Sequence, residues 1–202
     1  MSKSLILTVA DIETTGLKQE EGHRIIEIAM AVLKLEFSES HEFVEAKKVG
    51  STWCQRINPG RSIDPGAQAV HGISIADLKS EPAWPDVAGK VQKILTMSDV
   101  LAAHNAQFDA PFIALELVRI GMDIPKFDVF CTMEHGRTAT AMGKVPSLAE
   151  LCWSLGVRYE EGAAHAADYD VNCTVECVIK GLRAGAYDLT DSLKSKYGVQ
   201  VA

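Results

Sequence analysis

The sequence predicts an α/β fold in which a five-stranded mixed sheet carries helices on its faces. Extended segments, apolar or alternating, follow one another in the first part of the chain, which is typical of strands that pair in sequence. Farther on, short apolar segments alternate with amphipathic helical patterns, which favours strands joined by helices. The 202 residues, 47% of them hydrophobic, suffice for one such core, so we expect a single domain over residues 1–202.

Each expected strand has its own signal. The first, LILTVADI, is apolar almost to its end, which suits a central strand covered on both faces. The second contains the alternating segment AVLKLEF and should form a hairpin with the first. Residues 41–50 are polar and are expected to be a loop, and the turn Asn58-Pro59-Gly60 should end the third strand. The expected strands are residues 5–12, 24–37, 51–57, 100–103 and 127–131.

The expected helices show apolar residues at helical spacing. Asn105 is expected to be the N-cap of the helix that follows the fourth strand, and Gly121 lies near the end of that helix. The glycine- and threonine-containing segment 136–146 is expected to be a mobile loop. The expected helices are residues 65–70, 74–79, 85–97, 106–120, 147–155, 166–183 and 188–196.

The bulk properties exclude some classes of protein. A net charge of −7 argues against a protein that coats nucleic acid by charge alone, although it is compatible with an enzyme whose carboxylates hold cations. The five cysteines contain no CxxC pair, which favours reduced thiols in a cytoplasmic protein and no zinc site. No apolar run approaches the ~18 residues that span a bilayer, so we expect no membrane association.

Asp11 and Glu13 are the first candidate metal ligands. They are two residues apart at the end of the expected central strand, so both side chains should leave the same face while Ile12 points into the core. Two adjacent carboxylates repel each other and lose hydration there, a conflict that a bound Mg²⁺ or Mn²⁺ would remove. Two exposed acids at a strand end are the alternative.

The next four residues, Thr14, Thr15, Gly16 and Leu17, are candidates for binding a substrate. Threonine hydroxyls and the amides of a tight glycine turn can hold a phosphate or a sugar hydroxyl, and Leu17 could lie against a base. A plain turn explains the same residues equally well.

Asp109 in HNAQFD is expected on the first turn of a helix, just after the fourth strand. A helix N-terminus favours a carboxylate by ~0.3–1 kcal/mol, so helix electrostatics alone could explain it. Its position after that strand, however, would bring it near the end of the first strand. Phe108 is either a core residue or a stacking surface.

His165 and Asp170 in HAADYD complete the candidate site. A histidine is well suited to take a proton from water near neutral pH, although a solvated loop histidine is the alternative. Asp170 begins a row with Cys173, Thr174 and Cys177 at helical spacing, which should point it inward. Asp168, its rival, should face solvent.

Together, DIETTGL, HNAQFD and HAADYD resemble the motifs of the DnaQ-like 3′→5′ exonucleases of the DEDDh branch, the family that includes polymerase proofreading subunits and RNase T. The segment INPGRSIDPGAQAVHGIS resembles the stretch between the first two motifs, so the resemblance covers roughly residues 5–180. The related DEDDy branch has a tyrosine four residues before the last aspartate, where this chain has Ala166.

The resemblance implies an RNase H-like fold and two divalent metal ions, Mg²⁺ or Mn²⁺. One ion would be held by Asp11, Glu13 and Asp170, and the other by Asp11 with Asp109 nearby. His165 would deprotonate the attacking water.

The same resemblance implies that His71 lies near the terminal nucleotide. Asn105 and Phe108 of the second motif are further candidates for binding the substrate. Proofreading relatives often have an acidic residue shortly before this histidine, whereas this chain has Gly66-Ala67-Gln68-Ala69. The expected activity is removal of 5′-mononucleotides from the 3′ end of DNA, either single-stranded or mismatched. An exoribonuclease of the RNase T kind and an inactive binding module are the alternatives. A second copy of the chain or a polymerase would be the protein partner.

Overall fold

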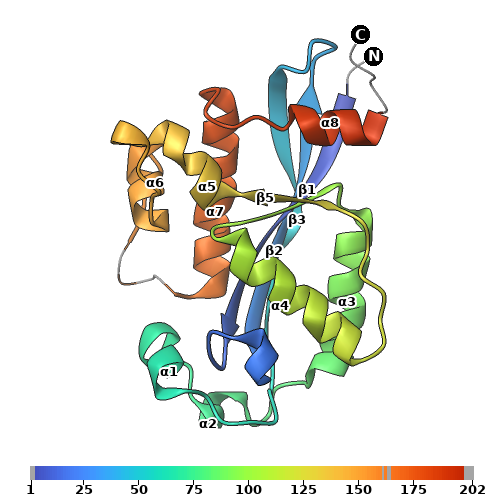
Figure 1. The fold of residues 1–202 in the computed structure, drawn as a ribbon, viewed down its shortest axis with the longest axis vertical. Coiled ribbons are helices and arrows are strands. Elements are labelled where there is room, and N and C mark those ends of the chain that lie inside the picture. The colour runs from blue at the N-terminus through green and yellow to red at the C-terminus, as the bar shows by residue number, and fades with distance from the viewer. Residues whose placement is uncertain (1–2, 161, 163–164, 198–202) are drawn as a thin grey trace.

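The computed structural model describes residues 3–160, 162 and 165–197, and its centre is a five-stranded mixed sheet in the order β3-β2-β1-β4-β5 (Figure 1). The central strand β1 (Lys3–Thr14) is antiparallel to β2 (Ile25–Phe37) and parallel to β4 (Val100–Ala103). The α/β fold with a mixed sheet is therefore confirmed, as is the central place of the first strand.

Side chains alternate between the two faces of β1, and each face has its own core. Leu5, Leu7 and Val9 belong to the cluster that includes the buried side of α7 (Ala167–Arg183). Ile12 belongs to the cluster on the opposite face, beneath α3 and α4. Figure 1 shows α7 on one side of the sheet and α3 and α4 on the other, as expected for a sheet with helices on both faces.

The third strand corrects one expectation, because β3 (Phe43–Arg56) includes most of the segment 41–50 that we expected to be a loop. In this segment Lys47 pairs with Lys34, and Ala46 pairs with Leu35. β3 lies at the edge of the sheet, and its residues from 44 to 51 are mostly exposed. An exposed edge strand needs backbone hydrogen bonds to one neighbour but no apolar face, so a polar sequence can form it.

The expected loop 136–146 is also partly wrong, because two short 3₁₀ turns occupy it, η2 (Gly136–Ala139) and η3 (Ala141–Gly143). The Thr138 hydroxyl donates to the His135 carbonyl at 2.9 Å, and that of Thr140 donates to the Arg137 carbonyl at 3.2 Å. Threonine hydroxyls therefore support turns that the apolar pattern of the sequence does not reveal. The mobility of this segment stays a prediction.

The remaining expected elements are confirmed to within a few residues, and two short ones, η1 and α5, were not predicted. The two unpredicted elements are η1 (Gln19–Glu21) and α5 (Thr132–His135). The confirmed ones are α1 (Pro65–His71), α2 (Ile75–Leu78), α3 (Trp84–Met97), α4 (Ala106–Arg119), β5 (Asp128–Cys131), α6 (Leu148–Ser154) and α8 (Thr190–Tyr197). No helix among the residues that the structure describes is both long and apolar enough to cross a lipid bilayer.

The topology determines where polar side chains gather. β1, β4 and β5 are parallel, so their carboxyl ends lie together at one end of the sheet. Asp11 and Glu13 lie near the carboxyl end of β1, and α4, which carries Asp109, begins just after β4. Open α/β sheets bind ligands at the carboxyl ends of their parallel strands.

Candidate active site

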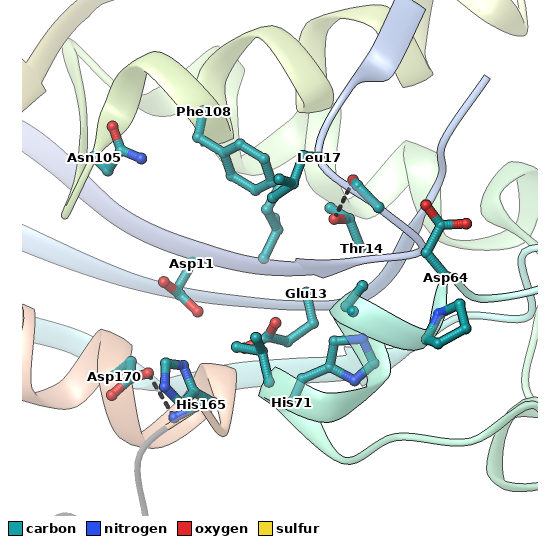
Figure 2. A pocket seen from close by; sticks show the side chains of 16 residues that line it. Asp11, Glu13, Thr14, Leu17, Asp64, His71, Asn105, Phe108, His165 and Asp170 are labelled. Atoms are coloured by element: carbon teal, nitrogen blue, oxygen red, sulfur yellow. Dashed lines mark hydrogen bonds between the residues drawn. The ribbon is translucent and has the colours of Figure 1, made fainter. Parts of the chain in front are cut away.

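A pocket of 720 Å³ opens at the carboxyl end of β1 (Figure 2). It combines acidic, histidine and apolar side chains from β1, α1, α4 and the start of α7. The residues that line it are Asp11, Ile12, Glu13, Thr14, Gly16, Leu17, Asp64, Pro65, Gly66, Ala67, Val70, His71, Asn105, Phe108, His165 and Asp170.

Asp11 and Glu13 continue the row of β1 side chains that packs against α7. Along this row the apolar residues end at Val9, and the next two positions are the carboxylates. Ile12 between them is 5% exposed and lies in the core of the other face, as the strand pattern predicted. Figure 2 shows both carboxylates pointing from β1 towards Asp170.

Asp170 lies on the first turn of α7 and is 7% exposed, whereas Asp168 is exposed. The predicted inward direction of Asp170 is therefore confirmed. Its Oδ2 accepts a hydrogen bond from the backbone N–H of His165 at 3.0 Å. Its Oδ1 is buried and has no hydrogen-bond partner among the described residues, which leaves a carboxylate oxygen available to a cation.

Asp109 is 3% exposed and does not line the pocket, but it lies within electrostatic reach of Asp11. Its helix α4 is tied to the start of β2, because Arg24 Nε and Nη2 donate to the buried Glu116 at 2.6 and 2.8 Å. Of the charged neighbours that raise the pKa of Asp11, Asp109 has the largest effect. The structure thus brings Asp109 to the end of β1, beyond what capping of α4 would require.

All four acids have raised carboxyl pKa values. Burial is the largest cause at Asp11, where the neighbouring acids add to it, and the pKa is well above its ordinary value. Burial and then Glu27 raise the pKa of Glu13 to about 8, and burial raises that of Asp109 to about 8. Burial also raises the pKa of Asp170. The protein therefore holds four carboxyl groups together with too little compensating positive charge.

These residues fit divalent cations, because carboxylate oxygens are the ligands that Mg²⁺ and Mn²⁺ prefer. The orphaned Oδ1 of Asp170 and the uncompensated charge of the other acids support that fit. Among the described residues, no three acidic, histidine or cysteine side chains form a preassembled metal site.

His165 lies where the chain enters α7, and its ring faces the pocket opposite Asp11 and Glu13 (Figure 2). Its backbone has φ 62°, a left-handed conformation that is uncommon for a residue with a side chain. The hydrogen bond from its N–H to Asp170 holds this conformation. The predicted base and the last predicted ligand are thus joined directly.

Thr15, in the turn after β1, was expected to bind the substrate, but it does not line the pocket. Thr15 is fully buried and absent from the pocket lining, and its hydroxyl is used by His23 Nδ1 at 3.0 Å and by the Arg24 N–H at 3.0 Å. Thr14 lines the pocket, although its hydroxyl donates to the Gly16 carbonyl at 2.8 Å. Leu17 is 79% exposed at the rim. The sequence could not show that Thr15 faces inward, because His23 reaches it only in the folded chain.

Gly16→Ala is expected to lower the free energy of unfolding by about 1–3 kcal/mol, because overpacking forces a shift of neighbouring atoms. A Cβ at this position would lie 2.3 Å from Cε1 of the buried His23 ring, which Thr15 holds in place. A thermal melt should show Tm lower by roughly 3–10 °C.

The matched control is Gly66→Ala, at another glycine of the same pocket, where a Cβ meets no atom within 4 Å. Its Tm should stay within about 2 °C of the wild type. An unchanged Tm for Gly16→Ala would mean that the His23 ring moves aside without cost.

His71 and Phe108, two further predicted residues, line the pocket. His71 ends α1, its Nδ1 accepts from the Ile73 N–H at 3.0 Å, and its Nε2 is buried without a partner among the described residues. Burial lowers the pKa of His71, which favours the neutral imidazole. Phe108 lines the pocket and also contacts Phe112, with ring centroids 4.9 Å apart. It is therefore part of the core, and its role as a stacking surface stays a prediction.

Asn105 occupies the predicted N-cap position of α4, but its side chain makes no capping hydrogen bond. Its backbone is left-handed, with φ 84°, rather than extended as a capping asparagine usually is. The capping role is therefore wrong, and the exposed amide lies in the pocket lining instead.

Sequence reasoning missed two acidic residues near the site. Asp64, at the N-cap position of α1, lines the pocket and lies 3.5 Å from His23 Nε2. The Asp-Pro dipeptide that starts a helix was its signal. Glu27 is buried on β2 directly opposite Glu13. A lone glutamate in an otherwise apolar strand, RIIEIAMAV, was the signal for Glu27.

Known proteins resemble this chain in sequence and in fold. The family model of the RNase T exonucleases matches residues 8–178. DNA polymerase III subunit epsilon of Escherichia coli (strain K12) is 31% identical over 175 residues, which cover 83% of this chain and 68% of the relative.

Solved structures share the fold. Exonuclease X in complex with 5′ overhanging duplex DNA superposes with a TM-score of 0.62 at 24% identity, covering 93% of this chain and 99% of that one. The nuclease domain of 3′hExo, described as a DEDDh family member bound to rAMP, has a TM-score of 0.64 at 18% identity and covers 90% and 93% of the two chains.

The family model alone covers well over half of the chain, and the similarity to the epsilon relative extends over two thirds of that relative's own length. The chain therefore belongs to the RNase T family of exonucleases, the DnaQ-like 3′–5′ enzymes that its motifs predicted.

Proposed function

We propose that this protein is a metal-dependent exonuclease that shortens DNA from the 3′ end, on single strands or mismatched ends, and releases 5′-mononucleotides. The observation that carries the proposal is the pocket at the end of β1, where Asp11, Glu13 and Asp170 face His165 and the buried Asp109 lies behind. Carboxylates of this number and proximity suit the binding of cations beside a phosphodiester.

The proposed ligands of two divalent ions, Mg²⁺ or Mn²⁺, are Asp11, Glu13, Asp109 and Asp170. When bound, such ions polarise a phosphate and stabilise the charge that develops on the leaving 3′-oxygen. The chain itself places the four carboxyl groups on β1, α4 and α7, so folding alone brings them near one another before a substrate arrives.

His165 is the proposed general base. Its imidazole would take the proton of the attacking water, and its position beside Asp170 directs the ring into the pocket. The left-handed backbone at His165 and its N–H bond to Asp170 restrict the directions that the ring can take.

The remaining lining suggests how the terminal nucleotide is bound. Leu17 and Phe108 offer apolar surface for a base, and Asn105 offers an amide to the backbone of the strand. His71 carries a buried Nε2 without a partner, which could bond to a sugar or phosphate oxygen. Thr14 and Gly16 also line the pocket, next to Glu13 in the sequence.

DNA is favoured as the substrate because several relatives at about 30% identity are named as epsilon subunits of a DNA polymerase. An exoribonuclease is the second candidate, because a solved neighbour is described as bound to rAMP. The inactive binding module is disfavoured, because the proposed ligands and base are all present and near one another.

A direct assay tests the proposal. Single-stranded DNA, RNA and a mismatched duplex, each labelled at the 5′ end, are incubated with Mg²⁺ or Mn²⁺ and compared with reactions that contain EDTA. A ladder that shortens from the 3′ end, absent with EDTA, is expected on DNA. Shortening of RNA alone would make the protein an exoribonuclease, and no shortening of any substrate would support the binding module.

The metal-free protein is expected to lose stability as the pH rises from about 5 to about 8. The folded state raises the carboxyl pKa of Glu13 and of Asp109 to about 8, whereas unfolded carboxyls titrate near ~4. Between these values the folded state holds protons that the unfolded state has released, so each step up in pH favours unfolding.

Added Mn²⁺ should counter this loss, because cations bind the deprotonated carboxylates. At a concentration about 100 times the Kd, binding contributes about 2.7 kcal/mol, or a rise in Tm of roughly 5–10 °C at pH 8. At pH 5.5 the rise should be much smaller. Melts with EDTA and with Mn²⁺ at both pH values measure this, and an equal Mn²⁺ shift at both would contradict it.

Several wider expectations stay proposals. We propose that residues 1–202 form one exonuclease domain, of which the family model covers residues 8–178. Pairing with a polymerase is suggested by the relatives that are named as polymerase subunits. Pairing of two copies and a cytoplasmic location are predictions from the sequence.

A further inference from the structure

Glu27 is a fifth acid beside the active site, and it is buried. It lies on β2 directly opposite Glu13 of β1 on one side and Arg56 of β3 on the other, and it is 6% exposed. It does not line the pocket, so a substrate would not touch it. Placing a carboxylate beside other carboxylates costs electrostatic energy, so its position calls for a physical reason.

Both oxygens of Glu27 have partners, and the partners come from different parts of the chain. Arg56 Nε donates to Oε1 at 2.9 Å, and the backbone N–H of Ala167 donates to Oε2 at 3.2 Å. Arg56 follows on the neighbouring strand, whereas Ala167 is 140 positions away and is the first residue of α7. The carboxylate therefore joins the edge of the sheet to the start of this helix.

The bond to Ala167 acts as a cap supplied from outside the helix. The first N–H groups of a helix lack partners within it, and a side chain at the N-cap position usually accepts one of them. Here the N-cap is Ala166, whose side chain cannot accept a hydrogen bond. Glu27 accepts instead, and its negative charge suits the positive end of the helix dipole.

The start of α7 is also where the catalytic groups lie. Asp170 is three residues beyond Ala167, and His165 is two residues before it, with a 3.0 Å bond joining the two. Asp11 and Glu13 stand on the sheet to which Glu27 belongs. The single carboxylate of Glu27 thus connects the two elements that must face each other for the site to be complete.

We propose that Glu27 is a positioning residue of the exonuclease site. It holds the start of α7 against β2, so that Asp170 and His165 keep their places opposite Asp11 and Glu13. The proposal rests on the proposed function. Stability alone does not account for such a pair, because the Arg56 side chain is 45% exposed and ion pairs with an exposed partner contribute little net stability.

The test compares Glu27→Ala and Glu27→Gln by steady-state kinetics on a single-stranded 5′-labelled DNA with Mn²⁺. Glu27→Ala should lower kcat by roughly 10–100-fold and raise the Mn²⁺ concentration for half activation by about tenfold, as losing a residue that orients ligands does. KM for the DNA should stay within about twofold. Glu27→Gln should lose no more than about fivefold in kcat, because its amide oxygen can still accept from Ala167.

The matched control is Glu36→Gln. Glu36 is on the same strand and is also paired with a cation, Lys34, at 2.9 Å, but it lies towards the opposite end of β2. Its kinetics should equal those of the wild type. Thermal melts of all variants show whether each is folded.

A second variant, Ala167→Pro, carries the test if Glu27→Ala does not fold. Proline removes the N–H that bonds to Glu27, and helices accept proline at their first position. The extended backbone of Ala166, with φ −107° and ψ 115°, suits a residue that precedes proline. We expect the same loss in kcat as in Glu27→Ala, with the bond between Arg56 and Glu27 still available.

Three results would overturn the positioning role: a kcat of Glu27→Ala within twofold of the wild type, a loss confined to KM, or a loss in Glu27→Gln equal to that in Glu27→Ala. The Asp11→Asn variant is assayed alongside to separate the two proposals. If Asp11→Asn keeps full activity, the proposed function itself fails. If Asp11→Asn is inactive while Glu27→Ala is normal, only the positioning role of Glu27 fails.

Discussion

Asp11→Asn should lower the rate of 3′ shortening by roughly a thousand-fold or more, the loss expected when a group that stabilises transition-state charge is removed. Asp11 is the central acid of the site, because Asp109, Glu13, Asp170 and Glu27 all act on its charge. Asparagine keeps the shape of the side chain and removes its charge. Single-turnover assays with Mg²⁺ and with Mn²⁺ measure the loss.

The same variant should be more stable than the wild type in EDTA at pH 8. Removing one of several mutually repelling buried carboxylates relieves electrostatic strain, and a gain of about 1 kcal/mol would raise Tm by about 2–4 °C. A variant that is inactive yet more stable cannot owe its inactivity to misfolding. If it were instead less stable in EDTA, the assignment of Asp11 to an uncompensated acidic cluster would be wrong.

The control for Asp11→Asn is Asp168→Asn. Asp168 lies on the same turn of α7 as Asp170 but is exposed and absent from the pocket lining. Its activity should stay within about twofold of the wild type. A large loss at Asp168 would mean that the last motif contributes a different acid from the one the burial pattern selects.

His165→Asn should lower kcat by about 10²–10⁴-fold, the usual contribution of a general base. Asparagine tolerates the left-handed backbone that His165 adopts, so the loss reports the imidazole rather than backbone strain. Hydroxide can replace the missing base. The residual rate should therefore rise by about tenfold for each pH unit between pH 7 and 9.

His41→Asn is the matched control, because His41 also has a left-handed backbone, with φ 68°, and lies in the turn between β2 and β3, outside the pocket lining. Its kcat should equal that of the wild type. Activity of His165→Asn close to the wild type would remove the base from the mechanism and leave the carboxylates alone to account for the rate.

Much of the fold could be predicted because its signals are local. The apolar run before Asp11 identified the central strand, since only a strand covered on both faces is apolar along its whole length. Alternation along that strand put Asp11 and Glu13 on one face, and helical spacing turned Asp170 inward and Asp168 outward. Each of these inferences needed only neighbouring residues.

The errors arose where distant segments decide the outcome. Most of residues 41–50 form an edge strand because the backbone of β2 offers hydrogen bonds to them, which no polar pattern reveals. Thr15 was expected in the pocket, but His23 and the Arg24 N–H occupy its hydroxyl. Asn105 occupies the predicted cap position without capping, since its backbone is left-handed.

The sequence alone therefore determined the order of strands and helices, the family and the acids and histidine of the candidate site, because motif and periodicity are properties of the chain itself. Only the tertiary structure decided how these groups interact. It buried Asp109 within reach of Asp11 and raised the pKa of their carboxyl groups, since burial and charge proximity arise only when β1, α4 and α7 meet. It also placed Glu27 against Ala167, a contact between residues 140 positions apart that no local pattern could contain.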